Sequence, residues 1–193
     1  VSGLLISTLS NIIERRVERC RSGRVHYRMR DHYVLIGTDA MLPGLILQLF
    51  GRDRKCQVVV QTIKDVEEVR RKLFSHLPHA YERRIAFCYA RRDSLEELEA
   101  LGVADAREVY ILGDSGELDD IEYYHDSLNV DCLNLIGHIC RAHGRAAPLR
   151  CHLLMEYRST FSVFQFSDIA PEIKPYIDLR PFNFYEMWAR KVF

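Results

Sequence analysis

The chain has 193 residues, of which 48% are hydrophobic and 28% are charged. This length is sufficient for one domain of ordinary size with an attached segment. The 27 Lys and Arg residues balance the 27 Asp and Glu residues. Because there is no excess of positive charge to attract phosphates, we expect no nucleic-acid partner. The sequence also contains no run of 18 or more apolar residues, the length that a membrane helix requires.

The first 30 residues change abruptly in character. Residues 1–13 are apolar or small, whereas residues 14–30 are rich in arginine. An apolar helix end followed by arginines is typical of the cytoplasmic end of a membrane helix, because Lys and Arg accumulate on that side. A surface amphipathic helix or a dimerisation helix explains the same pattern equally well. The first residue is Val rather than Met, so we expect the chain to be a piece of a longer protein.

From residue 31 onward, short apolar runs alternate with segments of helical periodicity. Strands are predicted at 32–37, 57–61, 84–89, 108–113 and 149–155, and helices at 43–50, 64–77, 95–101 and 127–143. Ser94 and Glu97 are spaced as a capping box for the third of these helices. This alternation indicates an α/β fold with a doubly wound, mainly parallel sheet of the Rossmann type and right-handed crossovers.

After Glu156 the alternation is expected to stop. Residues 160–166 could form a strand or a short helix, three prolines interrupt the stretch that follows, and Asn183 would cap a last, aromatic-rich helix. We therefore divide the chain into an N-terminal linker helix and basic segment (1–30), a Rossmann-like lobe (31–156) and a C-terminal aromatic-rich extension that could begin another lobe (157–193).

The six cysteines contain no Cys-x-x-Cys pair, and most lie within apolar runs. We expect them to be reduced core residues of a cytosolic protein. Zinc binding is an alternative for a cluster of five residues, His138, Cys140, His143, Cys151 and His152. Because adjacent residues of a strand point to opposite faces, Cys151 and His152 cannot both turn inward, and we favour core and surface roles.

In a doubly wound sheet, ligands bind at the carboxyl ends of the strands, where the strand order reverses. The residues that the pattern places around this crevice, and that we predict to bind a ligand, are Gly37, Thr38, Asp39, Gly44, Gln61, Thr62, Asp93, Gly113 and Asp114.

Three departures from the dinucleotide fingerprint argue against NAD as that ligand. The second glycine of the fingerprint is replaced by Asp39, which would put a carboxylate where a phosphate lies. Gly44 comes seven residues after Gly37, too late for the motif, and Gln61 stands where an acidic residue would bind the ribose hydroxyls. Neither a Gly-x-Ser-x-Gly elbow nor a Walker loop is present, so we predict that the chain is not an enzyme.

Two stretches carry a resemblance to a known family. One is the succession of a strand with Gly37, a strand with Gln61 and a strand with Asp93. It leads into residues 95–112, where a helix, a Gly-Val-x-x-Ala turn and an apolar strand follow one another. This order resembles the N-terminal lobe of regulator-of-potassium-conductance (RCK) domains, also called TrkA-N domains, over roughly residues 30–156. Residues 35–49, with a Gly-x-x-x-x-Leu loop, are most similar to the divergent branch that includes the plant Castor and Pollux cation channels.

The resemblance implies a cytosolic gating domain of a potassium or other cation channel, located on the cytoplasmic side of the membrane. Such domains pair as dimers and assemble as a ring in a tetrameric channel, and residues 1–30 would join this domain to the membrane pore domain upstream. The resemblance also implies a sensed ligand, either Ca²⁺ or a nucleotide. For Ca²⁺, the candidate ligands are Asp39, Asp93, Asp114 and Glu117, although the same carboxylates could simply cap helices.

Two other functions remain open from the sequence. One is a fragment of an NAD-dependent oxidoreductase of the same fold. The other is a free-standing regulatory subunit of a potassium transporter, in which residues 1–30 would be an assembly helix.

Overall fold

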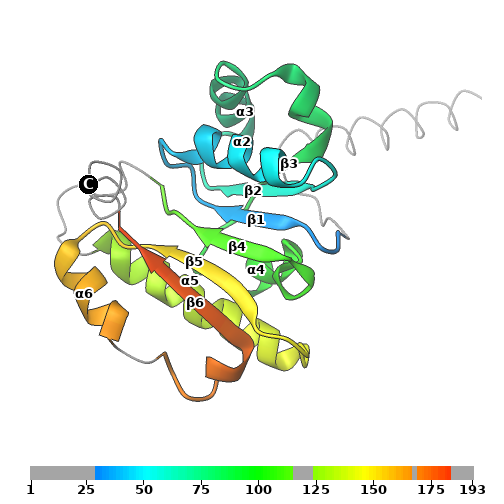
Figure 1. Ribbon diagram of the computed structural model, residues 1–193. Coiled ribbons are helices and arrows are strands. Elements are labelled where there is room, and N and C mark those ends of the chain that lie inside the picture. Colours follow the sequence, from blue (N-terminus) through cyan, green and yellow to red (C-terminus); the bar gives the residue numbers. More distant parts are fainter. Residues whose placement is uncertain (1–28, 115–123, 167–168, 184–193) are drawn as a thin grey trace, which may run out of the picture.

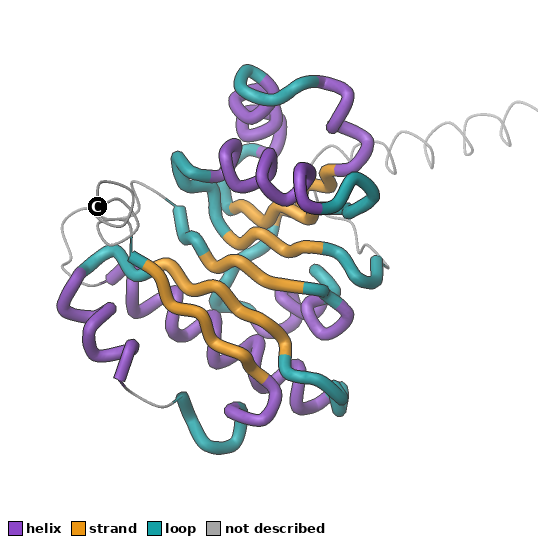
Figure 2. The backbone as a smooth tube through the Cα atoms, viewed as in Figure 1, coloured by secondary structure: helices purple, strands orange, loops and turns teal. Residues whose placement is uncertain are grey.

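The computed structural model describes residues 29–114, 124–166 and 169–183 (Figure 1). Its centre is a six-stranded sheet in which every pair of neighbouring strands is parallel, in the order β3-β2-β1-β4-β5-β6. The strands are β1 (Tyr33–Ile36), β2 (Val58–Thr62), β3 (Ile85–Tyr89), β4 (Glu108–Ile111), β5 (Leu149–Leu154) and β6 (Ile177–Phe182), and Figure 2 shows them side by side. The predicted Rossmann-like α/β fold is confirmed.

Helices pack on both faces of the sheet (Figure 1). The α-helices are α2 (Leu42–Arg52), α3 (Val66–Phe74), α4 (Leu95–Ala100), α5 (Tyr124–Ala142) and α6 (Arg158–Phe166), and short 3-10 turns are η1 (His79–Arg84), η2 (Val103–Asp105) and η3 (Lys174–Tyr176). One core cluster joins α2 and α3 to one face, and the other joins α4, α5 and α6 to the opposite face. Alternate strand residues enter the two clusters, as Val34 and Leu35 do in β1. Burial on both faces explains why the central strands read as continuous apolar runs.

The strand–helix alternation continues past Glu156, so the expectation that it stops there was wrong. Residues 158–166 form α6, and the chain then returns as β6, which pairs with β5 from Leu149 to Leu154. The sequence pattern of β6 does not predict a strand, because β6 lies at the edge of the sheet and is only partly buried. Only Ile177 in it is fully buried, and Pro181 lies within it, as proline does at sheet edges. Whether residues 157–193 also begin a further lobe stays a prediction.

One predicted helix cap, at Ser94, differs from the structure, and the other, at Asn183, is not tested. Ser94 occupies the N-cap position of α4, but its side chain makes no capping hydrogen bond, and the carboxylate of Glu97 instead accepts the N–H of Arg91. The side-chain amide of Asn183 donates to the carbonyls of Met155 (2.7 Å) and Glu156 (3.0 Å), which ties the end of β6 to the end of β5. The helix that Asn183 was expected to cap lies outside the described residues.

The five cysteines of the described residues are free and buried. Burial raises the pKa of Cys88 and Cys140 to about 11 and that of Cys132 to about 12. These thiols stay protonated near neutral pH and serve as small core side chains. Cys20 lies outside the described residues.

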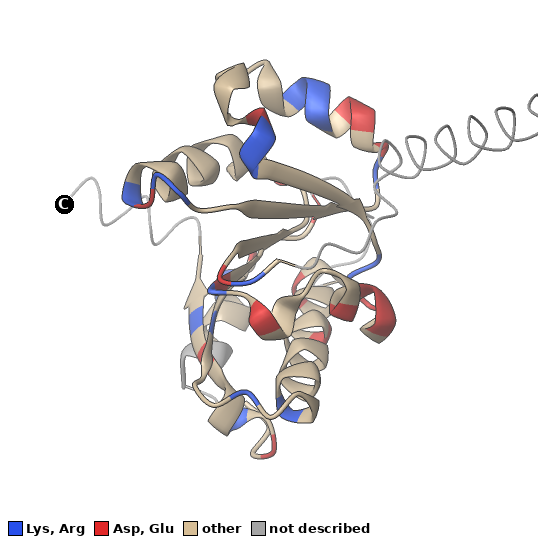
Figure 3. Ribbon diagram, turned by 90° about the vertical axis from the view of Figure 1, so that its right-hand side faces the viewer, with Lys and Arg blue, Asp and Glu red and all other residues tan. Residues whose placement is uncertain are grey.

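Charged side chains are distributed over the helices and loops, and the strands at the centre of the sheet carry few of them (Figure 3). Over residues 29–114, 124–166 and 169–183, no helix has the length and apolar character needed to cross a lipid bilayer. The predicted pore-helix end and arginine-rich linker lie almost wholly before residue 29, outside the described part.

Candidate ligand-binding crevice

The strand order reverses between β1 and β4, because the connections from these two adjacent strands run to opposite sides of the sheet. Ile36, the last residue of β1, is level with Gln61 on one neighbour and with Ile111 on the other. The segments that leave the carboxyl ends of these strands therefore meet at one edge. This is the place where Rossmann-like sheets bind ligands, and the predicted site residues, Gly44 excepted, lie at this edge.

Gly37 and Gly113 allow β1 and β4 to end in contact with each other. Gly37 has φ +94° and Gly113 has φ +74°, conformations that glycine adopts readily. A Cβ atom on Gly37 would lie 2.1 Å from the carbonyl oxygen of Gly113, and one on Gly113 would lie 2.2 Å from Nε2 of His125. The close approach of the two backbones thus requires Gly37, and the packing of the His125 side chain requires Gly113.

Gln61 is fully buried at the edge of the sheet. Its side-chain oxygen accepts the N–H of Gly37 (3.0 Å), and its side-chain nitrogen donates to the carbonyl of Ala90. One amide thereby connects the ends of β1, β2 and β3. Thr62 is also buried, and its hydroxyl accepts the N–H of Lys64 (3.0 Å). Both residues stabilise the strand ends that border the crevice. Their contact with a ligand stays a prediction.

A carboxylate from the segment after β4 accepts the N–H of the loop after β1 that would face a pyrophosphate. Asp114, which is 1% exposed, accepts hydrogen bonds from the backbone N–H (2.8 Å) and the hydroxyl (2.5 Å) of Thr38. Lys64 Nζ lies 4.0 Å from the same Asp114 oxygen. A phosphate at this loop would have to displace a buried carboxylate that already satisfies its donors.

The predicted placement of Asp39 where a phosphate would lie stays a prediction. The carboxylate of Asp39 accepts the N–H of Met41 (3.0 Å), two residues ahead, and so stabilises its own turn. Gly44 lies in the first turn of α2, where a Cβ atom would meet nothing within 4 Å. Its role as a site glycine therefore has no support from close packing.

A cavity of about 390 Å³ lies beside this closed loop, at the carboxyl ends of β2, β3 and β4. Two of the predicted site residues, Asp93 and Asp114, line it, and the other lining residues are Ile63, Tyr89, Arg91, Arg92, Tyr124 and Leu128. Arg91 binds both carboxylate oxygens of Asp93, at 2.9 and 2.6 Å. These hydrogen bonds from Arg91 lower the pKa of Asp93. The cavity combines two arginines with two aromatic side chains, a set that suits an anionic, ring-containing ligand.

The described carboxylates do not gather as a calcium site. Asp39, Asp93 and Asp114 are engaged with Met41, Arg91 and Thr38 respectively. Within the residues that the structure describes, no group of three or more His, Cys, Asp or Glu side chains is placed to hold a metal ion. Glu117, the fourth predicted ligand, lies outside those residues. The zinc alternative gains no support either, because Cys140 and Cys151 are fully buried and Nε2 of His152 lies 3.1 Å from a carboxylate oxygen of Glu108.

Two residues at the crevice had no sequence signal that pointed to them. Nε2–H of His125 donates to the carbonyl of Leu112 (3.1 Å), which fixes the end of β4. Asp126 is 1% exposed and accepts hydrogen bonds from the N–H groups of Glu156 (2.7 Å) and Tyr157 (3.1 Å) and from the hydroxyl of Thr160. Their partners are far away in sequence, so only the folded chain brings them together.

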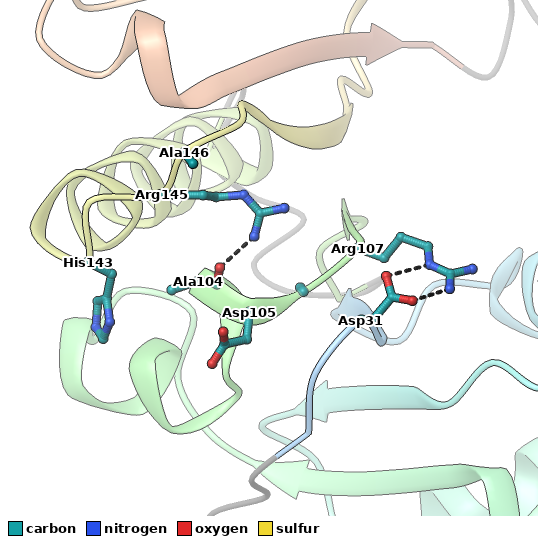
Figure 4. Close-up of a pocket in the computed structure, with 8 residues that line it drawn as sticks. Asp31, Ala104, Asp105, Arg107, His143, Arg145 and Ala146 are labelled. Atoms are coloured by element: carbon teal, nitrogen blue, oxygen red, sulfur yellow. Dashed lines mark hydrogen bonds and ion pairs between the residues drawn. The ribbon is translucent and has the colours of Figure 1, made fainter.

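A second cavity, of about 480 Å³, lies near the amino ends of the strands, where the chain enters β1 (Figure 4). It is lined by Asp31, Ala104, Asp105, Ala106, Arg107, His143, Arg145 and Ala146. None of the predicted site residues is among them. The larger cavity is therefore not the one at the strand-order reversal, and fold topology favours the smaller cavity as the ligand site.

Comparison with known proteins identifies the same fold in solved structures. No protein-family model matches the sequence, and no curated protein matches it. The GsuK RCK domain superposes with a TM-score of 0.54 at 16% identity, over 89% of this chain and 30% of that one. The GsuK channel bound to NAD gives 0.51 at 19% identity, over 84% and 25%. The TrkA-N domain of the inner membrane protein ybaL from Escherichia coli gives 0.50 at 14%, over 86% and 96%.

The chain thus spans less than a third of these GsuK chains and most of the ybaL domain. At these identities the likeness concerns the backbone. The chain has the Rossmann-like fold that is seen in RCK and TrkA-N domains.

Proposed function

We propose that this chain is a cytosolic regulatory domain of a cation channel, most simply a potassium channel, and that it senses a small ligand in the 390 Å³ cavity. The loop after β1 supports this proposal, because at the strand-order reversal Asp114 binds the N–H and the hydroxyl of Thr38 and closes the loop. A dehydrogenase of this fold needs that loop open for the pyrophosphate of its cofactor. In this chain the loop is closed, while a cavity with arginine and tyrosine side chains lies next to it.

The fold supports the same proposal. The GsuK chains that share it belong to a channel, and one of them is bound to NAD. The Castor and Pollux branch, the pairing of such domains and their assembly as a ring belong to the proposal as well. A ligand would act by binding more tightly to one arrangement of the domains than to another, since only differential affinity can shift such an equilibrium.

The arrangement of the cavity favours a mononucleotide over a dinucleotide. Tyr89, 41% exposed at the end of β3, offers a ring on which a base can stack. Arg92 offers positive charge for phosphate oxygens, and Arg91 would do so by exchanging its ion pair with Asp93. A dinucleotide would also need the N–H of Thr38, which Asp114 occupies. We therefore expect ADP to bind and the nicotinamide half of NAD to add no affinity.

Titration calorimetry of the 193-residue chain with ADP, NAD and NADH tests this expectation. Tyr89→Ala should weaken ADP binding about tenfold, because stacking of a base on an aromatic ring contributes about 1–3 kcal/mol. Leu47→Ala is the matched control, since Leu47 is 43% exposed on α2 and does not line the cavity. Tight binding of NADH that depends on the loop after β1 would contradict the proposal and favour the oxidoreductase.

Calcium stays a predicted ligand, because Glu117 lies outside the described residues. A calcium titration in the same series tests it. Heat of binding that is lost in Asp114→Asn would support a calcium site at the crevice, and the absence of any heat would remove Ca²⁺ from consideration.

A further inference from the structure

The backbone turns sharply where the N-terminal segment meets the sheet. Asp31, two residues before β1, has φ +56°, and it is the one non-glycine residue of the described part with a positive φ. Residues with a side chain hold this left-handed conformation only when their surroundings stabilise it. The contacts of Asp31 therefore stabilise the turn through which the chain enters β1.

Arg107, which precedes β4, supplies most of these contacts. Its Nε donates to one carboxylate oxygen of Asp31 (2.8 Å) and its Nη2 to the other. The backbone adds two bonds, because the N–H of Arg107 donates to the carbonyl of His32 (2.8 Å) and that of Asp31 donates to Asp105 (2.9 Å). Figure 4 shows the side chains of Asp31 and Arg107 pointing toward each other beside the 480 Å³ cavity.

His32 anchors the same turn from the interior. Its ring is buried, and Nε2–H donates to the carbonyl of Leu101 (3.0 Å). Burial lowers the pKa of His32, despite the hydrogen bond to Leu101 and the nearby Asp105 and Asp31, which raise it. A neutral ring fits this donor role near pH 7.

The same guanidinium also reaches helix α2. Nη1 of Arg107 donates to a carboxylate oxygen of Asp53 (2.6 Å), and Asp53 is the C-cap residue of α2. The loop behind it is held by Arg84, which donates to the carbonyls of Asp53 (2.9 Å) and Cys56 (3.0 Å) and lies over the ring of Phe50 at 3.8 Å. The residue that caps the C-terminal end of α2 is thus bound directly to Arg107.

The other end of α2 begins at Leu42, directly after the crevice loop with Thr38 and Asp39. A helix of 11 residues is about 16 Å long and transmits a displacement of one end to the other. A continuous series of packed contacts therefore leads from the crevice through α2 and Asp53 to Arg107, and from Arg107 to Asp31.

We propose that Arg107 is a positioning residue that clamps the exit of the N-terminal segment to the end of α2, and so couples the crevice to residues 1–30. The coupling to the crevice rests on the proposed function, whereas the contacts of Arg107 with Asp31 and Asp53 can be tested without it. Arg107 makes three side-chain bonds to two carboxylates. A planar guanidinium can make them together, whereas the single ammonium of lysine cannot.

Hydrogen exchange of the 193-residue chain tests the clamp. In Arg107→Lys and Arg107→Gln, the amides of residues 30–33 should exchange faster by about tenfold or more, because the turn opens locally. Exchange in β5 should stay unchanged, which separates local opening from global destabilisation. The matched control is Arg180→Gln, which removes a bidentate Arg–Asp pair with Asp178 (3.0 and 3.3 Å) on the edge strand β6. Wild-type exchange at 30–33 in Arg107→Lys, or equal loosening of β5, would overturn the clamp.

A second arm with saturating ADP tests the coupling. We expect ADP to slow exchange at residues 30–33 in the wild type and to lose this effect in Arg107→Lys. An equal slowing in both proteins would overturn the path through Arg107. If ADP does not bind at all, the proposed ligand is wrong, while the first arm still decides whether the clamp exists.

Discussion

Gly37→Ala is expected to lower the free energy of unfolding by about 4 kcal/mol or more, enough to unfold many single domains. Two costs combine at this position. The backbone φ of +94° is unfavourable for a residue with a side chain, and the new methyl group would lie 2.1 Å from the carbonyl oxygen of Gly113. That oxygen belongs to the backbone at the end of β4, so it cannot rotate away as a flexible side chain would. The change therefore forces β1 and β4 apart at the crevice.

Gly44→Ala is the control for this prediction. Gly44 lies in α2, and a Cβ atom there meets nothing within 4 Å. Alanine should stabilise the helix by about 0.5–1 kcal/mol relative to glycine. Urea denaturation of both variants gives the two changes directly. Equal stability of Gly37→Ala and the wild type would show that the strand ends do not meet as described.

Asp126→Asn is expected to cost about 2–4 kcal/mol, because it leaves buried donors without a carboxylate. Asp126 is 1% exposed at the start of α5, and it accepts hydrogen bonds from Glu156, Tyr157 and Thr160. These residues form the connection from β5 into α6. An asparagine has the same shape but offers one oxygen and two N–H donors, which face the existing donors. The loss should loosen α6 and β6 first.

The contribution of Asp126 should also depend on pH. Burial alone raises the pKa of this carboxyl, but the hydrogen bonds from His125, Thr160 and the N–H groups of Glu156 and Tyr157 outweigh burial and lower it. A lowered pKa in the folded state adds stability above the pKa of the unfolded chain, about 3.9 for Asp. This stability is lost as the pH falls through the folded-state value. The gap in stability between wild type and Asp126→Asn should thus be full at pH 7 and shrink below about pH 4.

Chemical denaturation at several pH values measures this gap. Asp131→Asn provides the control, since Asp131 lies exposed on the same helix, and it should change stability by no more than about 0.5 kcal/mol at any pH. A gap that stays constant down to pH 3 would mean that the carboxylate of Asp126 is not the group that binds these donors.

The sequence predicts the central part of this fold because its signals are local. Apolar runs such as residues 33–36 and 58–60 are strands buried on both faces, and Val66, Val69 and Leu73 form a buried helix stripe at helical spacing. The glycines at 37 and 113 also indicated where strands end. The α6–β6 unit had weaker signals, because an edge strand with a proline and exposed charges does not read as a buried strand.

The candidate site was predictable in position but not in its contacts. Strand ends in a parallel sheet meet at one edge, so Asp114 and Thr38 could be placed near each other from the topology alone. Their hydrogen bond joins residues 76 positions apart, and the interaction of Arg107 with Asp31 has the same separation. Such pairs depend on strand order and side-chain direction, which no local pattern encodes. This is why the sequence could place Asp114 and Gln61 at the crevice but could not predict their hydrogen bonds to Thr38 and Gly37.

Under the proposed function, a ligand in the crevice regulates the passage of cations. The same proposal makes this chain part of a longer channel protein, and current recording from that protein in a planar bilayer is the decisive test. We predict a potassium-selective current whose open probability changes when ADP is added on the side of this domain, and a response that Tyr89→Ala weakens and Leu47→Ala preserves. A full-length protein that conducts no cation with or without ADP would contradict the account.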